Sequence, residues 1–365
     1  MDDVVVSRDD RFMARALELA RTAPFTSPNP RVGAVVVRGS EVVSEGFHRG
    51  AGTAHAEAAA LEGVDAAGAT LYVNLEPCSH TGRTAPCAPL VAASGVARVV
   101  AANGDPDPRV SGAGFEVLRA QGVEVTTGVL EPEGEWLNAA YFHHRRTGRA
   151  YVSLKLAMTL DGRLGAPDRS SRWVTGEAAR RLTHRRRLEV EAVLVGSGTV
   201  ALDDPSLTVR AVDAPRQPLI VVVDSSGSVA PTATLFGGPA DVVVATHPSV
   251  PHEAQTAWKE AGAEVLTIPA PPLETGVDLD ALIAELGRRG IVEVLCEGGG
   301  RLATELLRRD LVDRFELHHG AATIGGDGPG IGDLGARTMS DARRWKLMET
   351  QVLDDDVITV YRRAS

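Results

Sequence analysis

The twelve residues Glu76-Pro-Cys-Ser-His-Thr-Gly-Arg-Thr-Ala-Pro-Cys87 follow an apolar run that predicts a strand at 70–75, and a helix is expected from Cys87 onward. Upstream, His55-Ala-Glu57 stands at the start of a helix expected at 54–61. An imidazole and two thiolates are ligands that zinc binds, and three protein ligands leave the fourth position of a tetrahedral ion open for water, as in catalytic sites. The sequence therefore predicts a catalytic zinc site formed by His55, Cys78 and Cys87.

Glu57 is the expected proton carrier of this site. Zinc lowers the pKa of a bound water from about 15.7 toward about 7, so a nearby carboxylate can take up its proton at neutral pH. Glu57 would pass that proton to a ring nitrogen and to a departing amine. Inside a helix, residues two apart do not share a face, so His55 and Glu57 can cooperate only where a helix begins. The alternative, two buried structural thiols, leaves the order of the motifs unexplained.

The pattern around these motifs alternates strands and helices, which predicts an α/β layered fold. In the first half, helices are expected at 8–21, 54–61, from 87 and at 114–120, and strands at 32–37, 41–47, 70–75, 98–102 and 123–126. In the second half, strands are expected at 151–158, 192–195, 219–223, 241–245 and 292–296, and helices at 177–188, 277–288 and 301–308. The polar, basic segment between Asn138 and Arg149 is interpreted as the domain boundary, with domains at 1–147 and 148–365.

Composition narrows the class of protein. The net charge of −10 argues against a nucleic-acid partner. The acidic start is not that of a secretory signal, and no apolar run reaches the roughly 18 residues of a membrane span, so a cytoplasmic enzyme acting on a small molecule is expected. Three cysteines in such a protein favour metal or catalytic use over disulfides. The third, Cys296, lies in an expected strand and is interpreted as an inert core thiol.

The zinc motifs resemble the cytidine-deaminase-like superfamily, although Cys87 comes six residues later than the usual Pro-Cys-x-x-Cys pattern would place it. That insertion, with Pro28-Asn-Pro-Arg-Val-Gly33 and His48-Arg-Gly-Ala-Gly-Thr-Ala-His55, is similar to the deaminase half of the bifunctional riboflavin-biosynthesis family. The resemblance implies a cytidine-deaminase-like three-layer domain. It also implies a 2,5-diamino-6-(5-phosphoribosylamino)pyrimidinone substrate that loses its 2-amino group.

Other residues of the first half have weaker signals. Asn29 could hydrogen-bond the substrate's ring or ribose, or could be only a turn residue between prolines. The inserted loop carries donors that could cover a phosphate, namely His80, Thr81, Arg83 and Thr84. Asp105-Pro-Asp107-Pro is interpreted as a turn and not a metal site, and Glu76 as supporting structure.

The second half contains a dense series of motifs. They are Thr159-Leu-Asp-Gly-Arg163, Ser171-Arg-Trp173, Gly196-Ser-Gly-Thr199, Asp203-Asp-Pro-Ser-Leu207-Thr-Val-Arg210 and Glu297-Gly-Gly-Gly300. The series resembles the reductase half of the same family, which has a dihydrofolate-reductase-like fold, and implies reduction of the ribosyl group to ribityl with NADPH in a homo-oligomer (dimer or tetramer). By this resemblance the cofactor contacts include Ala157, Trp173, Thr199 and Asp203. The substrate contacts include Ser171, Arg187, Leu207, Arg210 and Glu297.

Three features of the second half also make chemical sense alone. Gly299 and Gly300 lie between an expected strand and helix, where bare backbone N–H groups and a helix N-terminus suit a pyrophosphate, although a strand-end turn is the alternative. The motif is not G-x-G-x-x-G, so no Rossmann domain is expected. Ser225 could meet the adenosine 2′-phosphate, which favours NADPH over NADH. Lys155 stands in an apolar strand, where its charge needs a carboxylate or the substrate as partner.

Two alternatives remain at this stage. The arginines at 180, 181, 185, 186 and 187 could form a nucleic-acid patch, but a solvated helix face is the favoured interpretation in a chain with only three lysines. A tRNA-editing deaminase, or the same bifunctional family with one inactive half, would also carry the zinc motifs.

Overall fold

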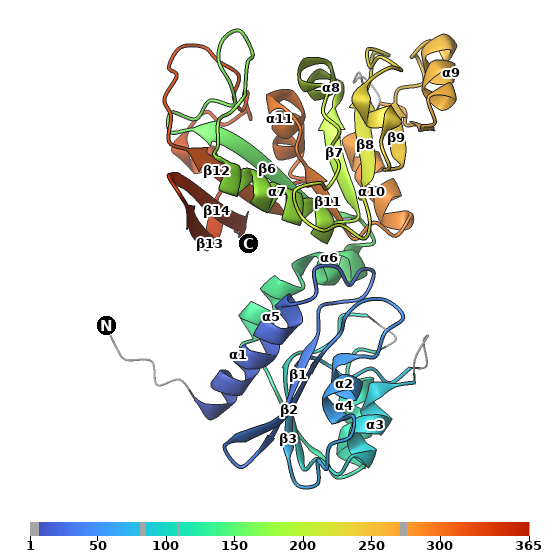
Figure 1. The fold of residues 1–365 in the computed structure, drawn as a ribbon, viewed down its shortest axis with the longest axis vertical. Helices are drawn as coiled ribbons and strands as arrows, with labels where there is room; N and C mark the ends of the chain where they lie inside the picture. Colours follow the sequence, from blue (N-terminus) through green and yellow to red (C-terminus); the bar gives the residue numbers. More distant parts are fainter. Residues whose placement is uncertain (1–6, 81–84, 108–109, 271–275, 365) are drawn as a thin grey trace. The chain divides into compact units, whose positions relative to one another are not determined.

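The computed structural model of the protein describes residues 7–80, 85–107, 110–270 and 276–364. The chain forms two compact units, Met1–Gly148 and Arg149–Ser365 (Figure 1). The boundary proposed from the sequence lies one residue earlier, between 147 and 148. Within the described residues, no helix has both the length and the apolar character needed to cross a membrane.

The first unit is built on a five-stranded sheet with the spatial order β2-β1-β3-β4-β5. Its strands are β1 (Gly33–Arg38), β2 (Glu41–Phe47), β3 (Thr70–Leu75), β4 (Arg98–Asn103) and β5 (Glu124–Thr127). β1 runs antiparallel to β2 and β3, whereas β3, β4 and β5 are parallel. The segments that follow parallel strands emerge at the same edge of the sheet, which is where open α/β sheets bind ligands.

Helices cover both faces of this sheet (Figure 1). They are α1 (Arg8–Arg21), α2 (Ala56–Leu61), α3 (Cys87–Ala93), α4 (Ala113–Ala120) and α5 (Glu131–Leu137). Successive strand residues point to opposite faces, so Val36 and Val73 pack with α2, α3 and α4, while Val35 and Tyr72 pack against α1. The result is the three-layer arrangement expected for a deaminase domain.

The segment assigned to the domain boundary belongs to the first unit. α5 was not predicted from the sequence, and the helix α6 (Ala139–Thr147) follows it at once. Tyr141 and Phe142 of α6 are buried against Leu75 at the end of β3. The boundary segment is therefore a packed helix, and it carries side chains to the edge of the sheet where the candidate site lies.

The second unit has a nine-stranded sheet with the order β10-β9-β8-β7-β11-β6-β12-β14-β13. Its strands are β6 (Tyr151–Thr159), β7 (Ala192–Gly196), β8 (Leu219–Asp224), β9 (Val242–Thr246), β10 (Glu264–Thr267), β11 (Glu293–Cys296), β12 (Arg314–Gly320), β13 (Trp345–Leu353) and β14 (Asp356–Arg363). The strands from β10 to β12 in this order are parallel, β14 pairs antiparallel with β12, and β13 pairs antiparallel with β14. β10 and β12 to β14 are absent from the sequence-based expectations.

The two faces of this sheet differ in character. One face is apolar throughout: Val152, Leu154 and Leu156 of β6 pack against α10 (Leu279–Arg288) and α11 (Gly300–Arg308). The opposite face is apolar beside β7, β8 and β9, where Val200 of α8 (Ser197–Asp203) and Trp258 of α9 (His252–Glu260) join the core. Over β6, β11 and β12 that face is polar, and α7 (Glu177–Glu189) sends arginine side chains to its carboxylates.

Candidate active sites

The three predicted zinc ligands come together at one end of the first unit. His55 is the residue before the first turn of α2, Cys78 follows β3, and Cys87 begins α3. The Nδ1 atom of His55 lies 3.2 Å from the Sγ atom of Cys87 and 3.6 Å from that of Cys78. The three ligand atoms all lie within 4.8 Å of one another. This is the only group of three metal-binding side chains found in the described part of the chain.

The donor set and its spacing fit zinc. With Zn–N and Zn–S bonds of about 2.0 and 2.3 Å, tetrahedral ligand atoms lie roughly 3.5 to 4 Å apart. The 3.6 Å from His55 to Cys78 matches this separation, and the 3.2 Å from His55 to Cys87 is slightly shorter. All three cysteines of the protein are free thiols, so Cys78 and Cys87 are available to an ion. Three protein ligands leave one coordination position for water, as predicted.

Even without a metal ion, a hydrogen bond joins the two cysteine side chains and shifts their pKa values in opposite directions. A hydrogen bond from the Cys87 thiol, followed by one from His55, lowers the pKa of Cys78 to about 4. The same bond raises the pKa of Cys87, because its proton is held between the two sulfur atoms. The lowered pKa favours the thiolate form of Cys78, which is the form in which cysteine binds metals.

Glu57 lies in the first turn of α2, next to the cluster, and its side chain is 3% exposed. Burial raises the pKa of Glu57 to about 7. A carboxyl group with a pKa near the working pH can both accept and donate a proton, which is the requirement for a proton carrier.

A cavity of about 290 Å³ opens onto His55, Glu57 and Cys78. Asn29 lines it, and the side-chain amide of Asn29 donates to Nε2 of His48 at 3.0 Å. Nδ1 of His48 lies 3.0 Å from the carbonyl oxygen of Ala54, so that nitrogen carries the proton and Nε2 accepts. His80 also lines the cavity, whereas Thr81, Arg83 and Thr84, the other expected phosphate donors, lie outside the described residues.

Glu76 supports the cavity wall, as expected. Its carboxylate accepts backbone N–H bonds from Asp105, Gly112 and Gly114 at 2.9–3.1 Å, and thereby fixes the loop after β4. The Asp105–Asp107 segment is a turn, closed by a bond from the Asp107 N–H to the side chain of Asp105. Both aspartates also line the cavity, which the sequence analysis did not anticipate.

In the second unit, five of the predicted cofactor residues follow the carboxyl ends of β7, β8 and β11, namely Thr199, Asp203, Ser225, Gly299 and Gly300. Ala157 lies within β6, opposite His318 of β12, and Trp173 lies in the segment before α7. The N–H of Gly299 donates to the hydroxyl of Thr199 at 3.0 Å, which joins the loop after β11 to the start of α8. A Cβ atom on Gly300 would lie 2.2 Å from the carbonyl oxygen of Gly330, so only glycine fits at the first residue of α11. Open backbone N–H groups at this edge suit the phosphates of a dinucleotide.

Other predicted residues adjoin this edge. The hydroxyl of Ser171 lies 3.5 Å from Asp203, at the end of α8. Trp173 is 67% exposed, and the guanidinium of Arg180 stacks on its indole ring at 4.5 Å. Ser225 is exposed directly after β8. An exposed aromatic ring and an exposed hydroxyl at the same sheet edge are available to a ligand.

Lys155 lies on the polar face of the sheet, beside Glu316 in the register of β6 and β12. Burial lowers the pKa of Lys155, against the opposing attraction of Glu297 and Glu316. The carboxylate oxygens of Glu297 accept hydrogen bonds from Nε and Nη2 of Arg187, at 2.6 and 2.9 Å. The expected carboxylate neighbours of Lys155 are therefore present, but an arginine already holds each of them.

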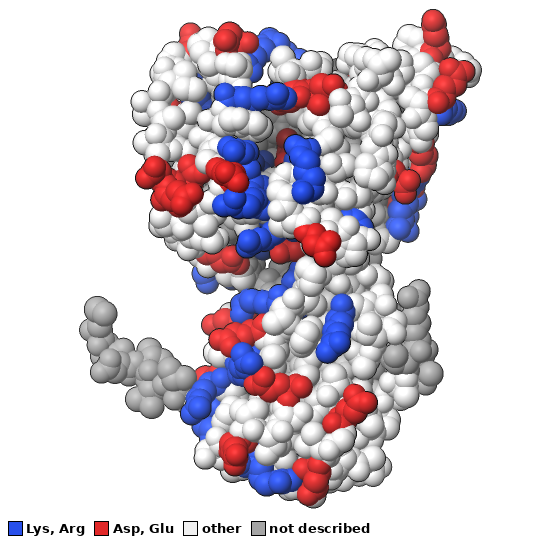
Figure 2. Space-filling view, in the orientation of Figure 1, with Lys and Arg blue, Asp and Glu red and all other residues white. Residues whose placement is uncertain are grey.

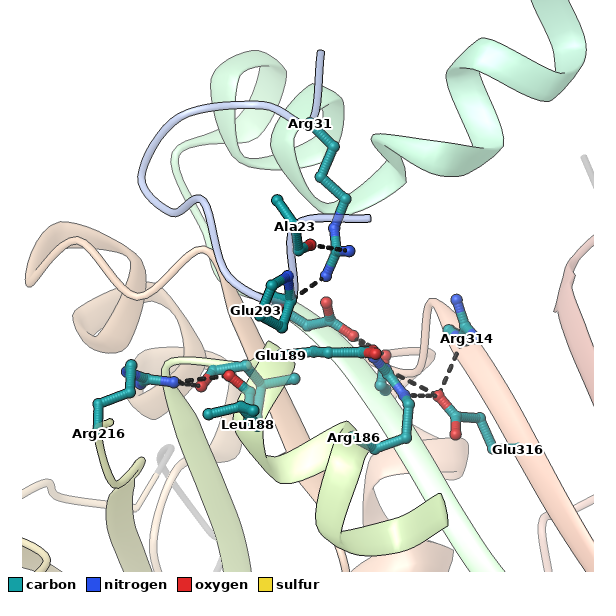
Figure 3. A network of polar contacts seen from close by, with 12 residues as sticks. Ala23, Arg31, Arg186, Leu188, Glu189, Arg216, Glu293, Arg314 and Glu316 are labelled. Carbon is teal, nitrogen blue, oxygen red and sulfur yellow. Dashed lines mark hydrogen bonds and ion pairs between the residues drawn. The ribbon is translucent and has the colours of Figure 1, made fainter. Parts of the chain in front are cut away.

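The interpretation of the arginine run as a solvated helix face is wrong for two of its members. Arg181 and Arg185 are exposed, but Arg186 and Arg187 are 8% and 9% exposed. Arg186 contacts Glu189, Glu293 and Glu316 at 2.7 to 3.0 Å (Figure 3). The arginine run alternates between solvent and a buried ion network because one side of α7 faces the sheet.

The remaining predicted substrate residues lie on the segment after α8. Leu207 adopts a positive φ of 54° and its side chain is buried in the core beneath β7 and β8. Arg210 is exposed, and its backbone N–H lies 3.4 Å from Nδ1 of His184 on α7. Basic side chains gather on the face of this unit seen in Figure 2, in the region that α7 occupies in Figure 1.

Comparison with known proteins covers nearly the whole chain. Residues 6–103 match the cytidine and deoxycytidylate deaminase zinc-binding region, and residues 150–359 match the RibD C-terminal domain. The riboflavin biosynthesis protein RibD of Aquifex aeolicus is 39% identical over 97% of this chain and 98% of its own length. The chain belongs to the RibD family.

Further RibD relatives agree. The Escherichia coli protein is 38% identical, covering 96% of this chain and 98% of its own length. Two solved structures, RibD of Acinetobacter baumannii and a deaminase/reductase of Thermotoga maritima, each have 33% identity and a TM-score of 0.83, covering 98% of this chain and 99% of theirs. The chain is thus a bifunctional deaminase and NADPH-dependent reductase of riboflavin biosynthesis with a zinc-binding deaminase site. Its second unit has the expected dihydrofolate-reductase-like fold.

Two residues of this RibD-family cavity were missed by the sequence analysis. Tyr141 and Arg145 of α6 line the cavity together with Asp105 and Asp107. The hydroxyl of Tyr141 donates to Asp105 at 3.1 Å. Nothing in the local sequence marks either residue, because both belong to the segment assigned to the domain boundary. Their role depends on the packing of α6 against the end of β3.

Proposed function

We propose that the first unit deaminates 2,5-diamino-6-(5-phosphoribosylamino)pyrimidin-4(3H)-one, and that the second unit then reduces the ribosyl group of the uracil product to a ribityl group. The proposal rests on the gathering of His55, Cys78 and Cys87 beside Glu57 in one cavity. It is supported by the Thermotoga maritima relative, described as a diaminohydroxyphosphoribosylaminopyrimidine deaminase and 5-amino-6-(5-phosphoribosylamino)uracil reductase.

In the deamination, water adds to C2 of the pyrimidine, ammonia leaves, and the C2–N bond is replaced by a carbonyl. Zinc, held by His55, Cys78 and Cys87, would activate the water as a Lewis acid. Glu57 takes the proton of the water, transfers it to the ring nitrogen, and then protonates the departing amine. Its pKa of about 7 suits this two-way transfer. Asn29, fixed by neutral His48, would donate its remaining amide hydrogen to the ring or ribose of the substrate.

In the reduction, opening of the ribosylamine ring breaks the C1′–O4′ bond, with a proton taken up by O4′, and leaves an imine carbon at C1′. NADPH supplies the hydride that adds to this carbon, and a proton completes the reduction. The cofactor would be held by a set of residues at the sheet edge: Ala157, Trp173, Thr199, Asp203, Ser225, Gly299 and Gly300. Ser225 would face the 2′-phosphate, which distinguishes NADPH from NADH.

The substrate of the reductase would lie against the polar face of the sheet. The proposed contacts are Lys155, Ser171, Arg187, Leu207, Arg210 and Glu297. Because Glu297 already occupies the guanidinium fork of Arg187, Arg187 would mainly orient that carboxylate toward the substrate hydroxyls. Exposed Arg210 would bind the 5′-phosphate. Lys155 has no carboxylate within ion-pair distance in the described part of the chain, so the substrate would provide its partner.

The protein is further proposed to be cytoplasmic and to form a homo-oligomer. All three cysteines are free thiols, which is typical of proteins in a reducing compartment. The edge strand β13 exposes Leu347 and Val352, and an exposed apolar edge is a common pairing surface. Light scattering during gel filtration of the purified protein measures the oligomeric state, and a monomer at micromolar concentration contradicts this part of the proposal.

A coupled assay tests the order of the two reactions. Purified protein given the diamino substrate should release ammonia first and oxidise NADPH only afterwards. Given the deaminated product, it should oxidise NADPH with no ammonia release. Oxidation of NADPH by the diamino substrate without ammonia release contradicts the proposed order.

Cys78 and Cys296 provide a matched pair for the metal assignment. Cys78→Ser removes a ligand and should lower the zinc content measured by plasma emission spectrometry, together with deamination. Cys296→Ser changes a fully buried thiol in β11 and should leave the zinc content at the wild-type value. Equal zinc in the two variants contradicts the ligand set.

A further inference from the structure

Arg145 is the only lysine or arginine among the described residues that line the deaminase cavity. The other ionisable residues of the lining are three histidines, Cys78, Tyr141, and four acidic residues: Glu57, Glu76, Asp105 and Asp107. A cavity wall with this balance repels a phosphate dianion unless a cation offsets the carboxylates. Arg145 is in the position to do so.

The guanidinium of Arg145 is held in place without using its donors fully. It stacks on the ring of Tyr141 at 5.1 Å, and Tyr141 is itself fixed by its hydrogen bond to buried Asp105. The nearest carboxylate is Asp107, whose oxygen lies 3.9 Å from Nε, too far for a hydrogen bond. Nε is buried and donates to no group of the described residues. Because Nε is covered by protein, a ligand in the cavity would meet the terminal nitrogens of this guanidinium, which has no hydrogen bond to a carboxylate among the described residues.

The neighbouring arginine shows the contrast. Arg146, next on α6, forms a 2.7 Å ion pair with Glu135, its side chain is 55% exposed, and it does not line the cavity. Both arginines lie on α6 and carry the same charge, and each stacks on an aromatic ring of its own, Tyr141 for Arg145 and Phe142 for Arg146. They differ in what their guanidinium groups face, so Arg146 is a matched control for Arg145.

We propose that Arg145 binds the 5′-phosphate of the deaminase substrate and makes the deaminase select phosphorylated over dephosphorylated pyrimidines. This inference rests on the proposed deaminase function of the cavity. Arginine suits the role because its planar fork can form two parallel hydrogen bonds with phosphate oxygens, and stacking on Tyr141 orients the fork in advance. Asp105 and Tyr141 act as positioning residues that fix the plane of the guanidinium.

The experiment compares ammonia release from the phosphorylated substrate and from the same compound after phosphatase treatment. Arg145→Leu should lower kcat/KM for the phosphorylated compound about 100-fold, mostly through KM, because the phosphate is remote from the reacting carbon. The dephosphorylated compound should react as it does with wild type. Arg146→Leu should leave both values within about twofold of wild type. Arg145→Lys, which keeps the charge but loses the fork, should give an intermediate loss.

Zinc content and NADPH oxidation of the deaminated product are measured on every variant, and wild-type values show that both units are folded. If Arg145→Leu does not fold, Arg145→Lys is used in its place. The measured quantity is its ratio of kcat/KM for the phosphorylated over the dephosphorylated compound, which should fall below the wild-type ratio. An unchanged preference in the folded variant overturns the Arg145 proposal and leaves the deaminase function intact. A wild-type protein that releases no ammonia from either compound overturns the deaminase function, and the Arg145 proposal with it.

Discussion

The zinc cavity and the polar face of the reductase sheet use charge in different ways. In the first unit, the reactive groups come from the ends of elements: a helix start, the residues after a strand, and the first residue of another helix. In the second unit, charged residues stand inside strands and are neutralised by arginines from α7, as in the Arg186 contacts to Glu293 and Glu316. The first arrangement depends on three ligands, and the second depends on a network in which each charge needs its neighbours.

This difference predicts how each region responds to the removal of one side chain. Removal of one group from the zinc cavity should abolish chemistry while the fold persists, because the groups lie at the ends of well-packed elements. Removal of one charge from the reductase network should destabilise the fold, because its former partners remain buried without compensation. The variants below test both halves of this comparison.

The largest expected effect is on deamination. Glu57→Gln keeps the shape of the side chain but cannot carry a proton, and should lower kcat for ammonia release by about 10⁴-fold. Zinc content and NADPH oxidation of the deaminated product should stay at wild-type values. Deamination within tenfold of wild type would falsify the assignment of Glu57 as proton carrier.

The next effect is on stability. Arg186→Met removes the buried guanidinium that neutralises Glu293 and Glu316, and should cost about 3–5 kcal/mol of unfolding free energy. The exposed Arg185→Met serves as the control and should change that free energy by less than about 0.5 kcal/mol. Urea denaturation measures both. Similar midpoints for the two variants would mean that the network adds nothing to stability.

The contrast between the regions also explains what the sequence could predict. His55, Cys78 and Cys87 were found because metal ligands are rare residue types that lie at element ends, where their motifs are visible in the chain. Strands β3 and β4 were found because their apolar runs are uninterrupted. Both signals are local, and neither depends on the partner that the segment packs against.

The elements that were missed lack such local signals. β12 carries Glu316, His318 and His319 in place of an apolar run, and the charge of Glu316 is neutralised by Arg314 of the same strand and by Arg186, which is far away in the chain. α6 has only Tyr141 and Phe142 buried, so its polar sequence gave no helical pattern and Arg145 went unnoticed. Pairings between residues more than a hundred positions apart follow from the fold and cannot be deduced from a single chain.

The smallest predicted effect concerns Glu191, which lies just before β7 and next to the reductase network. Its carboxylate accepts the N–H of Glu293 at 2.8 Å, and burial raises the pKa of Glu191 to about 7. Because the folded pKa lies above the usual value of 4.5, the folded state favours the protonated form. Ionisation of Glu191 therefore lowers stability as pH rises from about 4.5, and the full penalty applies above about 7.

Glu191→Gln removes that ionisation while keeping an oxygen to accept the Glu293 N–H. The variant should match wild type in unfolding free energy at pH 4.5 and exceed it by about 2 kcal/mol at pH 8, after allowance for partial solvent exposure. Glu253→Gln, on the exposed surface of α9, should show no such change with pH. Urea denaturation at the two pH values measures the difference. A gain in unfolding free energy that is equal at pH 4.5 and pH 8 would assign the effect to packing. A gain confined to pH 8 would mean that the ionised carboxylate of Glu191 destabilises the fold and that the neighbouring arginines do not compensate for it.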